Sequence, residues 1–123
     1  TMSIKYAAEN NIEIIVLDRP DPNGSYVDGP VMEAAHTSFL GMHAGVPLVH
    51  GMTVGELARW YGARRAPGCD LYVVPCDRDA RGEWVPPSPN MPTRDTATVY
   101  PGMCLLEGTT LSEGRGTTMF TCP

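Results

Sequence analysis

Three carboxylic acids in this sequence follow apolar segments that are predicted to be strands. Asp18 comes directly after the apolar run of residues 12–17. Glu107 and Glu113 come after a weaker apolar run, residues 103–106. Hydrolysis of a glycosidic bond uses two carboxyl groups on either side of that bond, one protonated and one ionised. All three acids are therefore candidates for such chemistry, and the sequence does not choose between them.

Two of the candidate positions have a structural interpretation as well as a functional one. Asp18 either acts on a ligand or forms an ion pair with Arg19 that fixes the loop after the strand. His50 lies three residues before a predicted helix start at Thr53. In the functional interpretation, His50 contacts a substrate oxygen or exchanges a proton near neutral pH. In the structural interpretation, it is a loop histidine that is hydrogen-bonded to backbone.

Two further segments carry polar groups that suit ligand binding. Asn90 lies between prolines, which restrict its backbone and favour a preorganised polar contact with a ligand. The alternative is that this segment is only a proline-rich turn that leads into a helix. Residues 107–118 contain two carboxylates, one arginine, three glycines and five hydroxyl groups, among them Ser112. Arg115 offers a planar fork for a carboxylate or phosphate. The segment lacks the lysine of a nucleotide phosphate loop, and the alternative is a solvated loop.

The elements that must position these residues alternate between helix and strand. Strands are predicted at residues 12–17, 71–74 and 103–106, and the first is expected to be covered on both faces because it is almost wholly apolar. Helices are predicted at residues 1–10, 53–62 and 93–99. The second begins with a capping box formed by Thr53 and Glu56, and its buried face is expected to hold Val54, Leu57, Ala58 and Tyr61.

This alternation predicts an α/β fold, a partial Rossmann-like domain of three layers with a mostly parallel sheet. Residues 18–52 and 75–102 form connections much longer than the roughly 15 residues that are common. Both connections, and the segment after residue 106, would leave the sheet at the carboxyl ends of its strands. Ligands of open α/β sheets bind at that edge, so these are expected to be ligand-side loops.

Composition excludes several classes of function. The chain has 123 residues, which suits one domain, and its net charge is −5. Because it has no block of basic residues, neither nucleic acid nor an anionic membrane surface is an expected partner. The longest apolar run is far too short to span a membrane. The four cysteines form no C-x-x-C motif, so we expect free thiols and no metal or other cofactor.

The longer motifs resemble a known family. HGMTVGELARWY at residues 50–61, PPSPNMPT at 86–93 and VYPGMCLLEGTTLSEGRGTT at 99–118 are similar to segments of the exo-β-N-acetylmuramidase family, formerly a domain of unknown function. The likeness implies that residues 1–118 are the latter part of a Rossmann-like N-terminal domain. Residues 119–123 would then begin a C-terminal segment that the chain does not contain.

The resemblance also implies a function. Members are expected to release N-acetylmuramic acid from the non-reducing end of peptidoglycan fragments. The family's proposed catalytic glutamate lies in an SPEHG-type motif that this chain lacks, so the main acid is expected upstream and the 123 residues alone are expected to be inactive. The lactyl carboxylate of muramic acid suits an arginine. The substrate-binding candidates are Arg19, His50, Asn90, Ser112 and Arg115.

Two other interpretations stay open at this point. The chain is alternatively a noncatalytic sugar-binding or subunit-interaction module derived from such an enzyme, or a remnant that does not fold alone because its sheet exposes unpaired edges. A periplasmic or extracellular location in a bacterium would follow if an upstream segment carried a signal peptide.

Overall fold

The computed structural model describes residues 2–36, 45–76, 84–112 and 114, and it divides into two compact units, Thr1–Ala80 and Arg81–Pro123. The first unit contains α1 (Met2–Glu9), β1 (Ile14–Leu17), β2 (Asp28–Val31), the 3₁₀ turn η1 (Ala34–His36), β3 (Pro47–Val49), α2 (Val54–Arg65) and β4 (Leu71–Val74). The second contains α3 (Arg94–Met103) and the 3₁₀ turn η2 (Cys104–Gly108). Within the described ranges, no helix is both long enough and apolar enough to cross a membrane.

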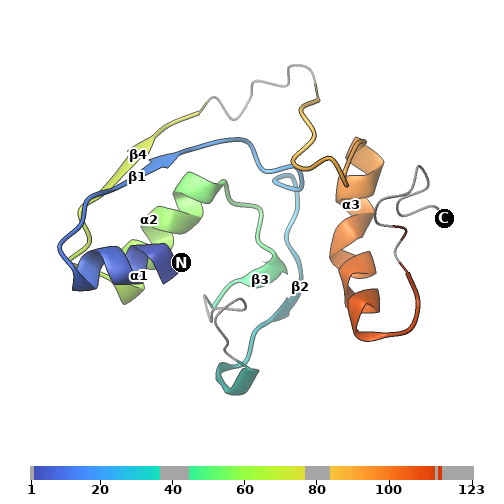
Figure 1. Ribbon diagram of the computed structural model, residues 1–123, viewed down its shortest axis with the longest axis horizontal. Coiled ribbons are helices and arrows are strands. Elements are labelled where there is room, and N and C mark those ends of the chain that lie inside the picture. Colours follow the sequence, from blue (N-terminus) through green and yellow to red (C-terminus); the bar gives the residue numbers. More distant parts are fainter. Residues whose placement is uncertain (1, 37–44, 77–83, 113, 115–123) are drawn as a thin grey trace. The chain divides into compact units, whose positions relative to one another are not determined.

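A parallel pair of strands organises the first unit. β1 and β4 run side by side, with Ile14 opposite Leu71 and Leu17 opposite Val74, and α2 lies in the connection between them (Figure 1). At its carboxyl end, a backbone bond from Asp18 N–H to the Val74 carbonyl at 3.0 Å extends the ladder beyond the strands. Because the strands are parallel and in register, the residues that follow Leu17 and Val74 emerge at the same edge.

The core lies on one face of this pair. Ile4 of α1 packs with Ala58 and Tyr61 of α2, and Tyr61 is only 2% exposed. The inward-facing residues of the strands, including Ile14 and Val16, pack against this cluster. Both helices therefore cover the same face, and the α/β class expected from the sequence is confirmed.

The predicted buried stripe of α2 is partly wrong. Ala58 and Tyr61 are buried as expected, but Val54 is 47% exposed and Leu57 is only half-buried. The buried positions also include Gly55 and Gly62. Two glycines on the inner face let the helix axis approach the strands closely, which a pattern of large apolar residues does not reveal.

The outer face of the strand pair is apolar and exposed. Ile15, Leu17 and Tyr72 are 57%, 73% and 58% exposed, and Val74 is 38% exposed. The expectation that the first strand is covered on both faces is therefore not met by the described residues. The strand also begins at Ile14 rather than at residue 12.

The first long connection is not a plain loop, because it contains a second pair of strands. β2 and β3 pair antiparallel, with Asp28 opposite Val49 and an irregular register between Asp28 and Val31. The sequence of β2, Asp-Gly-Pro-Val, contains three residues that are unfavourable in strands, which explains why it was not predicted.

The predicted strand at residues 103–106 is wrong. This segment forms the end of α3 and the start of η2. The helix begins as expected, with the Thr93 hydroxyl accepting a bond from Thr96 N–H at 3.1 Å, but it continues through Pro101. Proline removes one helical hydrogen bond without ending the helix here, and the chain then tightens into a 3₁₀ turn. A short apolar run is ambiguous between helix and strand.

Candidate functional site

The candidate site is built around the carboxylate of Asp18, where β1 ends. One oxygen, Oδ1, accepts hydrogen bonds from Gly55 N–H at 2.8 Å and from Arg19 N–H at 2.9 Å. The other, Oδ2, accepts a bond from the Thr53 hydroxyl at 2.9 Å. The thiol of Cys76, two residues after β4, also donates to this carboxylate. Asp18 therefore joins the ends of both parallel strands to the start of α2.

The sequence prepares the N-terminus of α2 for this contact. Thr53 and Glu56 form the predicted capping box, in which Glu56 N–H donates to the Thr53 hydroxyl and Thr53 N–H donates to Glu56 Oε2 at 2.9 Å. Thr53 is 1% exposed, and its hydroxyl accepts from α2 while it donates to Asp18. One buried hydroxyl thus connects the helix cap with the strand end.

Gly55 is required by the same contact. A Cβ atom at this position would lie 2.6 Å from Asp18 Cγ and 2.7 Å from Val73 Cγ1, which is closer than two non-bonded carbon atoms approach one another. The absence of a side chain therefore lets the backbone N–H of Gly55 reach the carboxylate. Gly55 and Cys76 were missed by sequence analysis, although a glycine two residues after the helix cap was a visible signal for close approach.

The hydrogen bonds determine the charge of Asp18. Burial raises its pKa, but the bonds from Gly55, Thr53, Arg19 and Cys76 together outweigh burial, so that the pKa lies below its usual value of 3.8. The carboxylate is ionised at neutral pH. This arrangement suits an anchor or a binding group and does not suit a proton donor.

Arg19 does not form the ion pair with Asp18 that was one expectation. Its backbone N–H bonds to Asp18, whereas its side chain is exposed and has no ion pair with any acid in the described part of the chain. The guanidinium is thus available to a ligand anion at the carboxyl edge of the strands.

His50 shows the backbone contact that was its structural alternative. Met52 N–H donates to His50 Nδ1 at 3.1 Å, and Asp21 Oδ2 lies 3.9 Å from the same nitrogen. Because Nδ1 accepts a bond, the neutral ring carries its proton on Nε2. His50 can therefore offer an N–H donor from Nε2 to a ligand oxygen.

The second unit holds Asn90 in a compact turn. Asn90 N–H donates to the Ser88 hydroxyl at 3.2 Å, and the Asn90 side chain is exposed. Trp84 closes the turn, since its Nε1–H donates to the Pro92 carbonyl at 3.0 Å while the Arg94 guanidinium lies 5.0 Å from the centre of its ring. The proline-rich segment is thus an ordered platform for Asn90.

The remaining predicted site residues lie in the last part of the chain. Glu107 is exposed on η2, and the Ser112 hydroxyl accepts a bond from Gly114 N–H at 3.1 Å. Glu113 and Arg115 lie outside the described residues. Since residues 103–106 are not a strand, the topological argument that placed Glu107 at the same sheet edge as Asp18 no longer holds.

Comparison with known proteins identifies the family. The family profile described as "Exo-beta-N-acetylmuramidase NamZ, N-terminal" matches residues 1–95, and the one described as "Exo-beta-N-acetylmuramidase NamZ, C-terminal" matches residues 98–121. The chain belongs to the NamZ family. The resemblance stated from the sequence motifs is therefore confirmed.

NamZ relatives agree in sequence and in fold. A peptidoglycan beta-N-acetylmuramidase NamZ from Bacillus subtilis (strain 168) is 44% identical over 94% of this chain. Two crystal structures of DUF1343 family proteins from Bacteroides fragilis NCTC 9343 also cover 94% of it, with TM-scores of 0.78 and 0.75 and identities of 43% and 35%. The chain spans about a third of the length of these relatives, 30% of the first and 35% and 33% of the other two.

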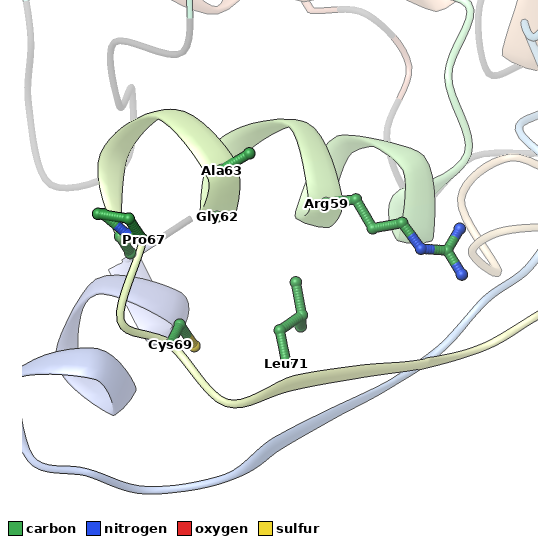
Figure 2. A pocket seen from close by; sticks show the side chains of 7 residues that line it. Arg59, Gly62, Ala63, Pro67, Cys69 and Leu71 are labelled. Atoms are coloured by element: carbon green, nitrogen blue, oxygen red, sulfur yellow. The ribbon is translucent and has the colours of Figure 1, made fainter.

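A hollow on this NamZ-family chain is lined by none of the predicted site residues. It has a volume of about 220 Å³ and is lined by the C-terminal half of α2 and the start of β4 (Figure 2). Arg59 is the one charged residue in its lining, which otherwise consists of small and apolar residues. Ligand pockets usually combine an apolar wall with several convergent polar groups, so this hollow is not the candidate site.

Proposed function

We propose that the protein that carries this chain is an exo-β-N-acetylmuramidase, which releases N-acetylmuramic acid from the non-reducing end of peptidoglycan fragments. Membership of the NamZ family carries this proposal. The 44% identity to a protein named as a peptidoglycan beta-N-acetylmuramidase supports it. No metal or other cofactor is part of the proposal.

Within that enzyme, the described residues supply binding groups and the anchor that holds them. Asp18 is ionised and accepts several hydrogen bonds, so we assign it to positioning rather than to proton donation. Arg19 directly follows Asp18 in the sequence. His50 lies three residues before Thr53, whose hydroxyl donates to Asp18. The catalytic acid is proposed to lie outside the 123 residues, with Glu107 and Glu113 as candidates for a second carboxylate.

The remaining candidates are assigned to substrate binding. The exposed side chain of Asn90 and the hydroxyl of Ser112 are proposed to contact hydroxyl or acetamido groups of the sugar. Either Arg115 or Arg19 is proposed to bind the lactyl carboxylate.

An activity assay with matched substrates tests the proposal. Protein expressed from the complete reading frame is expected to cleave a chromogenic N-acetylmuramide and to leave the corresponding N-acetylglucosaminide intact. The 123-residue chain is expected to cleave neither substrate. Absence of muramide cleavage by the complete protein would refute the proposed activity, and cleavage by the 123 residues would show that they contain the catalytic acid.

Removing either arginine is expected to reduce discrimination between the two sugars. A charge-assisted hydrogen bond contributes about 1.5–3 kcal/mol, so Arg19→Ala or Arg115→Ala should lower kcat/KM for the muramide by about tenfold or more. The glucosaminide lacks the lactyl carboxylate, so its poor turnover should not change. The exposed Arg59, which lines the separate hollow, is the matched control. If both variants keep the wild-type preference, neither arginine binds the lactyl group.

A further inference from the structure

The ring nitrogen Nδ1 of His50 faces two groups that require opposite protonation states. Met52 N–H lies 3.1 Å away and needs a lone pair on Nδ1. The carboxylate oxygen Oδ2 of Asp21 lies 3.9 Å from the same atom and is attracted to a proton on it. A histidine nitrogen cannot satisfy both at once. The protonation state of His50 therefore selects its partner.

The surroundings of Asp21 fix that carboxylate in place. Its Oδ1 accepts a bond from Asn23 N–H at 3.0 Å, and its backbone carbonyl accepts one from Gly24 N–H at 3.0 Å. The turn therefore holds Asp21 while leaving Oδ2 directed at His50. The two side chains are only 26% and 19% exposed, so solvent screens their interaction incompletely.

The other acids at this end of α2 already have partners. Asp18 accepts bonds from Thr53 and Gly55, and Glu56 accepts one from Thr53 N–H. Among the described residues, Asp21 is the acid that forms a pair with His50. Asp21 belongs to the segment after β1, and His50 belongs to the segment before α2, so the pair links two separate parts of the first unit.

We propose that His50 and Asp21 form a pH-sensitive switch at the entrance to α2. At higher pH, neutral His50 accepts the bond from Met52 and holds the backbone that leads to the Thr53 cap. At lower pH, the ring takes one proton from solvent onto Nδ1, releases Met52 N–H and pairs with the Asp21 carboxylate. This proposal does not depend on the muramidase activity.

NMR of the protein as a function of pH tests the switch. The neutral His50 ring is expected to carry its proton on Nε2, which its ring ¹⁵N shifts report. The Met52 amide resonance is expected to move with the same midpoint as the His50 ring. A neutral ring protonated on Nδ1, or a Met52 amide that does not follow the His50 titration, would overturn the proposal.

Two substitutions make the test specific. Asp21→Asn keeps the Oδ1 acceptor for Asn23 but removes the negative charge beside the ring, and it is expected to move the midpoint of the titration to lower pH. Asp70→Asn removes an exposed acid directly before β4 and should leave the midpoint unchanged. An unchanged midpoint in Asp21→Asn would refute the pair.

His50→Asn is the other test substitution. Its amide oxygen can take the place of Nδ1 as an acceptor, but the asparagine side chain does not titrate. The Met52 amide is then expected to lose its pH dependence while the spectrum keeps its folded dispersion. A Met52 titration that persists in this variant would show that another group causes it, and the switch would be refuted.

Discussion

Asp18→Ala is expected to lower the free energy of unfolding by about 3 kcal/mol at pH 7. Hydrogen bonds to a charged group contribute about 1.5–3 kcal/mol each and do not add fully. The substitution removes the acceptor of Gly55 N–H, Arg19 N–H and the Thr53 hydroxyl. Urea unfolding followed by circular dichroism measures the loss. Asp70→Ala, at an exposed position, is the matched control and should change stability by less than about 0.5 kcal/mol.

The loss of stability in Asp18→Ala is expected to depend on pH, and the sign of this dependence follows from the pKa of Asp18. Burial alone would raise the pKa of Asp18, but its hydrogen bonds lower it below 3.8 in the folded protein. A lowered folded-state pKa means that the stabilisation is complete above the unfolded-state value, about 3.9, and is lost as pH falls through the folded-state value. The difference between wild type and Asp18→Ala should be constant from pH 7 to about 5 and shrink below about 4. A difference independent of pH would show that the ionised carboxylate is not the stabilising species.

Gly55→Ala is the second substitution with a large expected effect, and its sign is opposite to that of an ordinary helix position. Alanine normally stabilises a helix by about 1 kcal/mol relative to glycine. Here the added Cβ would lie 2.6 Å from Asp18 Cγ and 2.7 Å from Val73 Cγ1. Overpacking costs about 1–3 kcal/mol, and displacement of Asp18 also weakens its hydrogen bonds. We expect a net loss of about 2 kcal/mol in the free energy of unfolding.

Gly62→Ala, on the same helix, is the matched control. A Cβ at Gly62 would lie 3.4 Å from Leu71 Cδ2, which is close to ordinary contact. This variant is expected to be neutral or to stabilise the protein by up to about 1 kcal/mol. In the Asp18→Ala background, the cost of Gly55→Ala should fall by about 1 kcal/mol because part of the clash is gone. Equal effects of Gly55→Ala and Gly62→Ala would contradict the proposed close contact.

Local signals in the sequence predicted the central βαβ arrangement. The capping box at Thr53 and Glu56 fixed the start of α2, and two apolar runs gave the parallel strands β1 and β4. The position of Asp18 after a strand placed it at the carboxyl edge. These features depend on short stretches of chain, for which hydrogen-bonding and apolar patterns are informative.

The features that the sequence did not predict depend on partners distant in the chain. The antiparallel pairing of β2 with β3 has no apolar alternation to reveal it. Residues 103–106 were predicted as a strand because a proline was expected to end α3, yet the helix continues through Pro101. The inner face of α2 packs through Gly55 and Gly62, which a count of large apolar residues omits.

The carboxylate at the start of α2 also restricts which ligands this βαβ unit can accept. In many α/β proteins, the amide groups at the beginning of the helix that follows a strand receive a phosphate, because that end of the helix is electropositive. In this protein, Asp18 already binds the Gly55 amide and brings a negative charge to the same place. A nucleotide phosphate would therefore meet both an occupied amide and electrostatic repulsion at this position.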